Sequence, residues 1–305
     1  MTQALVLADA SKRFGATQAL DGVSVTFAAG EVHALVGENG AGKSTLLGIV
    51  SGLVHPDPPS AMEINGRAVD LGRWSPKAAQ AAGVSLVPQE PAVIEPMTVA
   101  ENIFLGREPR RGPVLDRNGM RRRAGELLAR LGAGFSPDEP VERLSVAQLQ
   151  LLEIAKALSI SSRVVAMDEP SAVLAGDELD GLFRVIHQLA DGGVAVIYVS
   201  HRLDEVFVHC DLFTVLKDGQ VAGSGRVRDV GRADLVRMMV GRELADTFPS
   251  RSGTPGRVRL EVTGLSVPGK LEAVSLQARE GEILGIAGLM GSGRTTLAKA
   301  VFGAV

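Results

Sequence analysis

The stretch Gly37-Glu-Asn-Gly-Ala-Gly42-Lys43-Ser44 decides the fold, because it matches the pattern G-x-x-x-x-G-K-[S/T] of phosphate-binding loops. Its glycines would let backbone N–H groups face an anion, and the following helix would point its positive dipole end at the same place. Lys43 would add a full charge for the β- and γ-phosphates, and the Ser44 hydroxyl would bind Mg²⁺. The alternative is a Gly-rich turn, but an apolar run precedes the stretch and a helical pattern follows it. The sequence therefore predicts a nucleotide phosphate site here.

Short apolar runs along the chain predict strands that are buried on both faces, as in a parallel sheet covered by helices. They are Val32–Val36, Val84–Val87, Val164–Met167 and Val194–Val199. Helical periodicity lies between them, at Met120–Leu131, Gln148–Ile160 and Glu178–Leu189. This alternation predicts an α/β fold of the P-loop NTPase type with a parallel or mixed sheet. Because residues 98–158 contain no strong strand, we expect a helical subdomain at about 90–160.

Composition limits the class of protein. Apolar residues make up 45% of the 305 residues and charged residues 22%, which is ordinary for a globular protein and excludes collagen-like or disordered chains. The formal charge of −3 gives no electrostatic reason to expect a nucleic-acid partner. Cys210 is the single cysteine, so no intrachain disulfide is expected. No run of eighteen apolar residues and no secretory signal are visible, so we expect neither a membrane span nor export.

Polar side chains end three other predicted strands. Asp168 and Glu169 are adjacent carboxylates at the end of one strand, Gln89 follows a second and His201 follows a third. Taken alone, such residues are more often incidental, but the ends of parallel strands open toward one ligand crevice. Beside a phosphate-binding loop, Asp168 would support Mg²⁺, and Glu169 would orient or deprotonate an attacking water.

Two further features each allow two interpretations. Ser145 and Gln148, in Leu144-Ser-Val-Ala-Gln148, have the spacing of a capping box at the start of a helix. The simpler interpretation is a helix cap, and the other is that the capped helix end also offers a hydroxyl and free N–H groups to a phosphate. Phe14 is an isolated aromatic residue that either stacks on a base or fills a small core.

The end of the chain repeats its beginning. Gly288 lies 251 residues after Gly37, and at this offset many further residues recur without a gap. Val23, Ser24, Gly30, Glu31, Gly40, Gly42, Leu46 and Gly52 recur as Val274, Ser275, Gly281, Glu282, Gly291, Gly293, Leu297 and Gly303. This indicates an internal duplication. Because residues 247–257 have the Pro, Gly and Ser content of a linker, we expect a first domain at 1–246 and the N-terminal part of a second at 258–305.

These motifs, taken in order, resemble an ATP-binding-cassette (ABC) nucleotide-binding domain over residues 1 to about 245. Three stretches of the sequence are more similar still to the tandem ATP-binding subunit of bacterial monosaccharide importers of the ribose, xylose and galactose type. The stretches that carry this similarity are Leu144–Gln148, Glu153-Ile-Ala-Lys-Ala-Leu158 and Tyr198-Val-Ser-His-Arg-Leu-Asp-Glu-Val-Phe207. Residues 281–295 resemble the start of that family's second cassette, so the chain would hold one complete cassette and an incomplete, truncated duplicate.

The resemblance implies a role for each matching residue. Phe14 would stack on adenine. The phosphates of ATP would be wrapped by Gly37, Glu38, Asn39, Gly40, Ala41, Gly42, Lys43, Ser44 and Thr45. The helix end formed by Ser145, Ala147 and Gln148 would close on the γ-phosphate that a facing cassette holds. Mg²⁺ would be held by Ser44, Gln89 and Asp168, with Glu169 as the catalytic carboxylate and Gln89 and His201 beside the reacting phosphate.

The resemblance also implies partners and a place in the cell. The chain would pair with a copy of itself or with another cassette. It would lie on the cytoplasmic face of the inner membrane and act on transmembrane permease subunits, and through them on a periplasmic sugar-binding protein, with no nucleic acid as partner. Two residues depart from the family pattern. Ala147 replaces a glycine that is commoner at its position, and Arg294 stands in the second copy where the first has Lys43.

Two other functions stay open at this point. The chain would be an ATP-binding protein without effective turnover or transport if the incomplete duplicate prevents assembly. It would be an ABC ATPase of translation or repair if it bound nucleic acid, although neither a basic stripe nor a basic linker is visible. A GTPase lacks support because no Asn-Lys-x-Asp segment occurs.

Overall fold

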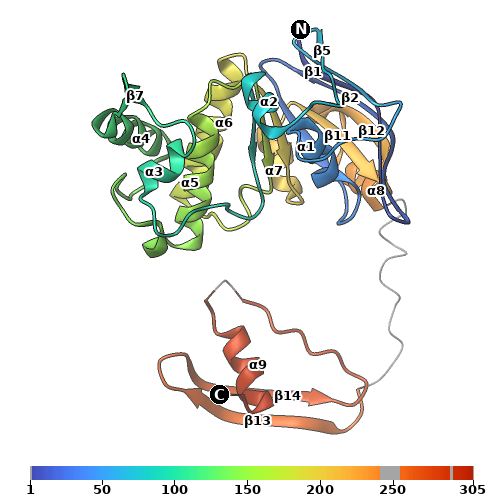
Figure 1. Cartoon of the computed structure of the whole chain (residues 1–305). Coiled ribbons are helices and arrows are strands. Elements are labelled where there is room, and N and C mark those ends of the chain that lie inside the picture. Colours follow the sequence, from blue (N-terminus) through green and yellow to red (C-terminus); the bar gives the residue numbers. More distant parts are fainter. Residues whose placement is uncertain (1, 241–254, 289–290, 305) are drawn as a thin grey trace. The chain divides into compact units, whose positions relative to one another are not determined.

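The computed structural model describes residues 2–240, 255–288 and 291–304. It divides into two units, Met1–Glu243 and Leu244–Val305 (Figure 1). Most of the linker expected at 247–257 lies outside the described residues. The two units are therefore described separately.

The first unit is built on a six-stranded mixed sheet, which confirms the expected α/β class. Its strand order is β12-β11-β3-β10-β9-β6, and all neighbours are parallel except β11 and β12. In chain order the strands are β3 (Val32–Val36), β6 (Val84–Val87), β9 (Val164–Asp168), β10 (Ala195–Val199), β11 (Leu212–Lys217) and β12 (Gln220–Arg226). Every residue of β3, β9 and β10 is buried, as the continuous apolar runs predicted.

An antiparallel sheet that the sequence analysis did not predict covers one face of the central sheet. It has the order β2-β1-β4-β5. Its strands are β1 (Gln3–Phe14), β2 (Thr17–Ala28), β4 (Ala61–Ile64) and β5 (Arg67–Ala68). Leu5 and Phe27 of this sheet share one buried core with Leu46 of α1 (Lys43–Val50) and Ile197 of β10. Helix α1 is thus packed between two sheets, which fixes the loop that precedes it.

Helices cover the opposite face of the central sheet. Successive side chains of each strand point to opposite faces, so the apolar strands supply side chains to a core on this side too. Met167 of β9 lies in a second core with Leu152 and Ile186 of two of these helices. The layer contains α3 (Val99–Phe104), α4 (Arg117–Leu131), α5 (Val146–Leu158) and α6 (Asp177–Asp191) (Figure 1). The stretch 98–158 is mainly helical as expected, but it also carries a hairpin of two-residue strands, β7 (Arg110–Arg111) and β8 (Val114–Leu115).

Short helices complete the first unit. They are α2 (Pro76–Ala81), α7 (Leu203–His209), α8 (Arg232–Val240) and the 3₁₀ turns Val141–Arg143 and Val227–Asp229. A third core joins α7 and α8 to β3 and β11. Among the described residues of both units, no helix combines the length and the apolar character that a membrane span needs.

The second unit contains a hairpin of β13 (Val258–Val267) and β14 (Leu271–Arg279), followed by α9 (Arg294–Phe302). Its hairpin repeats β1 and β2 in detail. Ser11 Oγ accepts a hydrogen bond from the Gly22 N–H at 2.9 Å, and Ser266 Oγ accepts one from the Ala273 N–H at 2.9 Å. The three register shifts between β13 and β14 lie at places that match register shifts between β1 and β2. These shared details support the duplication inferred from the sequence.

Candidate functional site

The phosphate-binding loop joins β3 to α1 and takes a backbone form that only glycine accepts at one position. Gly42, which caps α1, has φ +104°. A Cβ atom there would lie 2.5 Å from the Ala19 carbonyl oxygen and 2.7 Å from Leu20 Cδ2. The β1–β2 hairpin therefore presses on the loop at Gly42, and the absence of a side chain leaves the N–H groups at the start of α1 open to a ligand.

Lys43 is held inside the loop by the loop's own carbonyl groups. Its Nζ donates hydrogen bonds to the carbonyl oxygens of Gly37 at 2.7 Å and Glu38 at 2.8 Å. The side chain is buried, and burial lowers the pKa of Lys43, while the nearby charges of Glu169 and Asp168 act in the opposite direction. The ammonium group thus sits in a fixed place where an anion's charge would compensate its burial.

Asp168 ends β9 beside the loop and offers oxygen ligands together with Ser44. Burial raises the pKa of Asp168; the hydrogen bond from the Ser44 hydroxyl opposes the rise and the charge of Glu169 adds to it. A carboxylate and a hydroxyl are the hard oxygen donors that Mg²⁺ prefers. Within 2–240, 255–288 and 291–304, no cluster of three or more His, Cys, Asp or Glu could hold a metal. A magnesium ion here would therefore take its remaining ligands from other oxygen donors of the cleft, water and a phosphate.

Glu169 lies at the centre of the site in a left-handed backbone conformation, with φ +49°. Its N–H donates to the Val199 carbonyl oxygen at 3.1 Å, which anchors it to β10. One carboxylate oxygen, Oε1, lies 3.1 Å from His201 Nδ1, and the other, Oε2, accepts a hydrogen bond of 3.4 Å from Gln89 Nε2. Side chains that follow three parallel strands thus meet at one carboxylate.

These residues line one cleft of about 710 Å³. Its lining is Thr17, Ala19, Asn39, Gly40, Gly42, Lys43, Ser44, Thr45, Gln89, Asp168, Glu169 and His201. Thr17 and Ala19 belong to β2 and were not predicted from the sequence, because their place depends on how the hairpin packs on the loop. Gly37, Glu38 and Ala41 belong to the same loop but do not line the cleft.

Four other candidate residues do not join this cleft. Phe14 is half exposed at the end of β1, with Lys12 Nζ 5.5 Å from the centre of its ring. Ser145, Ala147 and Gln148 lie at the start of α5 and do not line the cleft. The capping box is confirmed, since Ser145 Oγ accepts from the Gln148 N–H at 3.3 Å and Gln148 Oε1 accepts from the Ser145 N–H at 2.9 Å.

A partly buried ion pair on α5 holds the segment that follows Gln89. Glu153 Oε1 lies 2.7 Å from Lys156 Nζ and also accepts a hydrogen bond from the Ala92 N–H at 3.1 Å. Lys156 Nζ donates to the Ala92 carbonyl oxygen at 2.6 Å. Both backbone groups of Ala92 are thus tied to the helix that begins after Ser145, so this helix and the chain after Gln89 are mechanically connected.

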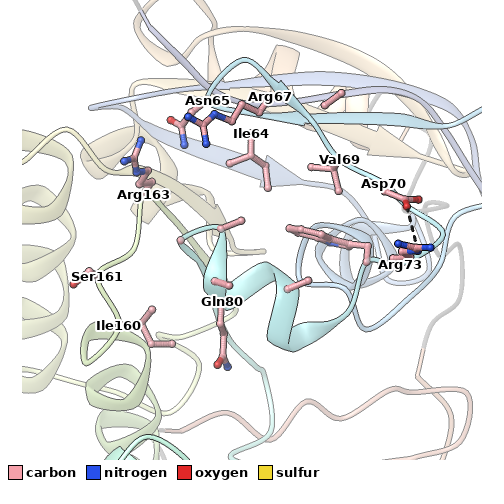
Figure 2. Close-up of a pocket in the computed structure, with 16 residues that line it drawn as sticks. Ile64, Asn65, Arg67, Val69, Asp70, Arg73, Gln80, Ile160, Ser161 and Arg163 are labelled. Atoms are coloured by element: carbon pink, nitrogen blue, oxygen red, sulfur yellow. Dashed lines mark ion pairs between the residues drawn. The ribbon is translucent and has the colours of Figure 1, made fainter. Parts of the chain in front are cut away.

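A larger hollow of about 880 Å³ lies elsewhere, between the β4–β5 hairpin, α2 and residues 160–163 (Figure 2). It includes Gly83 and Arg163, which directly precede β6 and β9. It is therefore at the ends of the strands opposite to the phosphate-binding loop. The polar groups around it include Arg67, Gln80 and an Asp70–Arg73 ion pair of 3.8 Å. None of the candidate site residues lies there.

Comparison with known proteins agrees with this geometry. The family model described as ABC transporter matches residues 20–172. The chain is 46% identical over 295 residues to the ribose import ATP-binding protein RbsA of Chromobacterium violaceum, and 49% identical over 293 residues to RbsA 1 of Rubrobacter xylanophilus. It is 44% identical to the galactose/methyl galactoside import ATP-binding protein MglA 1 of Photobacterium profundum. Each match covers 96% of this chain but only 58–59% of the relative, so the chain spans little more than half of their length.

Solved structures show the same fold. An ATP-binding cassette of an ABC transporter in its ADP conformation superposes with a TM-score of 0.66 at 26% identity, over 79% of this chain and all of that chain. A nucleotide-free cassette of an ABC transporter gives a TM-score of 0.68 at 25% identity, over 81% of this chain and all of that one.

Proposed function

This chain belongs to the ABC transporter family, and from that premise we propose that its first unit binds ATP with Mg²⁺ and hydrolyses it to energise monosaccharide import. The observation that carries the proposal is the meeting of Gln89, Glu169 and His201 in one cleft with Lys43 and Asp168. The sugar is inferred from relatives that are named for ribose and galactose import. Because the chain spans just over half the length of those relatives, the ATPase activity and the sugar substrate are part of the proposal.

The geometry supports a role for each residue of the cleft. The open N–H groups of the loop and the Lys43 ammonium would bind the phosphates. Ser44, Asp168 and Gln89 would hold Mg²⁺, which supplies charge neutralisation at the phosphates when it is bound. Glu169 would accept a proton from the attacking water or orient it, with His201 fixing the carboxylate.

We infer that the site is completed by a second cassette. Ser145, Ala147 and Gln148 offer a capped helix end that does not line the cleft of its own chain. Val146 between them is an exposed apolar side chain, 62% accessible. This end would approach the γ-phosphate of a facing copy or of another cassette, while Phe14 would reach the adenine. Transmembrane permease subunits at the cytoplasmic face of the inner membrane would receive the motion, and a periplasmic sugar-binding protein would deliver the sugar to them.

The second unit would be the N-terminal part of another cassette. This assignment, with a first domain at 1–246 and a linker at 247–257, rests on the repeat and on the matching hairpins. Arg294 there takes the place of Lys43, a forked cation in a position that suits a compact one.

The experiment compares binding with turnover. Glu169→Gln keeps the loop intact, so we expect MgATP to bind as in the unaltered chain while hydrolysis falls by about 10²- to 10³-fold. Glu63→Gln is the matched control, because Glu63 is an exposed carboxylate on β4 away from the cleft. Hydrolysis by Glu169→Gln at the unaltered rate would refute the catalytic assignment. Failure of the folded, unaltered chain to bind MgATP would refute the proposal as a whole, and binding without any turnover would indicate an ATP-binding protein instead.

A further inference from the structure

Three hydroxyl groups converge on one oxygen of a buried carboxylate next to the cleft. Glu205, on α7, is 7% exposed and does not line the cleft. Its Oε2 accepts hydrogen bonds from Ser171 Oγ at 2.7 Å, from the Tyr198 hydroxyl at 2.7 Å and from Ser200 Oγ at 2.9 Å. An ionised carboxylate accepts only, so it suits a place surrounded by donors.

The second oxygen of Glu205 binds a cation that reaches the same segments. Glu205 Oε1 lies 2.8 Å from Arg202 Nη1, which also donates to the Ser171 carbonyl oxygen at 3.4 Å. The Arg202 N–H donates to Ser200 Oγ at 3.0 Å. Ser171 is therefore held through its side chain and its backbone, and Ser200 is held from both sides.

The segments that meet at Glu205 carry the two groups that contact each other in the cleft. Ser171 comes two residues after Glu169, and Ser200 directly precedes His201. Glu169 has a left-handed backbone, a conformation that persists in a non-glycine residue only where the surroundings fix it. The Glu169 N–H bond to Val199 fixes one side of this turn, and the Ser171 contacts with Glu205 fix the other.

Burial makes the network specific. Tyr198 is fully buried, and burial raises the pKa of its hydroxyl far above the usual range, so the hydroxyl stays protonated and donates. Its oxygen lies 2.7 Å from Glu205 Oε2 and 3.1 Å from Ser171 Oγ. The charged carboxylate is the stronger acceptor of the two. Removing the charge of Glu205, as in Glu205→Gln, would replace the strong acceptor of these buried donors with a weaker amide oxygen.

We propose that Glu205 is a positioning residue for ATP hydrolysis. It locks the segments of Glu169 and His201 together, so that Glu169 Oε1 and His201 Nδ1 stay 3.1 Å apart. The inference rests on the proposed ATPase function. Glu205 would not touch ATP or the attacking water, so its effect would pass through the geometry of Glu169. Since small misplacements of a catalytic group are costly, turnover would suffer while ATP binding through the loop persists.

The first test separates kcat from KM in the full chain. In Glu205→Gln and in the milder Ser171→Ala, we expect kcat to fall by about 10- to 100-fold for the first variant and less for the second. The KM for MgATP should change by less than about twofold, because the loop is untouched. Asp204→Asn is the matched control with unaltered kcat, since Asp204 is the preceding residue on the same helix, is 80% exposed and pairs with Arg232.

A second measurement does not depend on activity. The Ala172 N–H donates to the Glu169 carbonyl oxygen at 3.2 Å and closes the turn, so its hydrogen exchange should speed up in Glu205→Gln and in Ser171→Ala but not in Asp204→Asn. In addition, the double variant Glu169→Gln with Glu205→Gln should hydrolyse ATP no more slowly than Glu169→Gln alone.

The outcomes distinguish the two claims. A chain that neither binds nor hydrolyses MgATP overturns the proposed function. A chain that hydrolyses ATP while Glu205→Gln and Ser171→Ala stay within about twofold of its kcat overturns the positioning role alone. If Glu205→Gln does not fold, Ser171→Ala decides: unaltered kcat and unaltered exchange at Ala172 would count against the inference.

Discussion

The two copies of the glycine loop differ in what surrounds them. In the first unit, Val32–Val36 forms β3 between β10 and β11, and all five residues are buried. The matching residues 283–287 of the second unit pair with no strand among the described residues, and Ile283 is 72% exposed. Yet the hairpin before this segment and the helix after it are formed in both units, with α9 beginning 251 residues after α1. The comparison separates local from long-range structure.

The difference teaches which structural features around a glycine loop form from nearby sequence. Hairpin bulges and a capped helix depend on hydrogen bonds between residues close in the chain. A central parallel strand instead depends on neighbours that lie far away in the sequence, here more than 150 residues from β3. The two carboxylates of the proposed phosphate site, Asp168 and Glu169, also come from the end of such a distant strand, β9. A glycine loop alone therefore does not make the site.

The largest contrast should appear in the strand itself. Leu35 is fully buried in β3, whereas its counterpart Ile286 is 47% exposed. Leu35→Ala should lower the free energy of unfolding by about 3 to 4 kcal/mol through lost burial and a cavity. Ile286→Ala should change it by less than about 0.5 kcal/mol. Trp74, the single tryptophan, is buried in the first unit, so its fluorescence during urea unfolding measures the first effect. Hydrogen exchange at the paired amides of β13 and β14 measures the second effect. A destabilisation of the second unit by Ile286→Ala as large as that of the first unit by Leu35→Ala would break the comparison.

A pH effect on stability should follow from His33, which lies two residues before Leu35 in β3. His33 is buried in β3, with Nε2 2.8 Å from Thr214 Oγ1, and burial lowers its pKa from 6.5 to about 4. Below pH 6.5 the unfolded chain binds a proton that the folded chain does not, so stability falls as the pH drops from 6.5 toward 4, by about 3 kcal/mol in total. His33→Leu introduces the residue of the second copy, Leu284, and should remove this part of the loss. The check is the Trp74 unfolding midpoint at pH 7 and pH 4.5, and an identical pH slope in both chains would contradict it.

Nucleotide binding should also distinguish the copies. Lys43→Ala removes a buried cation from the proposed phosphate site and should weaken MgATP binding by about 10- to 100-fold, as expected for loss of a charged hydrogen-bonding partner. Arg294→Ala should change affinity by less than about twofold, because the described second unit brings no strand-end carboxylate to its loop. Calorimetric titration measures both affinity and the number of sites per chain. Two sites, or a loss of binding in Arg294→Ala, would show that the second loop works without the neighbours found in the first.

The smallest effect should be the same in both units. Ser11→Ala and Ser266→Ala each remove one hydrogen bond of 2.9 Å from a hairpin bulge. The cost should be about 1 kcal/mol, which speeds hydrogen exchange at the Gly22 or Ala273 amide by about fivefold. Equal acceleration would confirm that the bulge is a local structure. A much larger effect in the second unit would show instead that the hairpin there depends on a single contact.

The sequence predicted those parts of the fold and site that depend on strong local patterns. A continuous apolar run predicted β9, because a strand that is buried on both faces carries apolar residues at successive positions. Residues at the ends of parallel strands were expected to converge, and Glu169 does meet Gln89 and His201. The antiparallel sheet was missed because β2 is buried only at alternate positions such as Val23, Val25 and Phe27, a weaker period-two signal.

The remaining parts depend on contacts that no local pattern encodes. Thr17 and Ala19 reach the cleft only because the hairpin packs against Gly42. The meeting of Ser171 and Tyr198 at Glu205 joins three elements whose separation in sequence gives no hint of contact. Such tertiary contacts require knowing how whole elements pack against each other.

The turn between the hairpin strands is four residues shorter in the second unit, where Pro268–Lys270 takes the place of Arg13–Ala19. Lys270 keeps the place of Ala19, because its carbonyl oxygen faces Gly293 as that of Ala19 faces Gly42. The shortening instead removes the stretch that carries the aromatic ring of Phe14 and the cleft residue Thr17. The shorter turn therefore offers no aromatic ring on which a purine base beside the second glycine loop could stack. A nucleotide base bound beside the second glycine loop would have to find its stacking partner elsewhere in the protein.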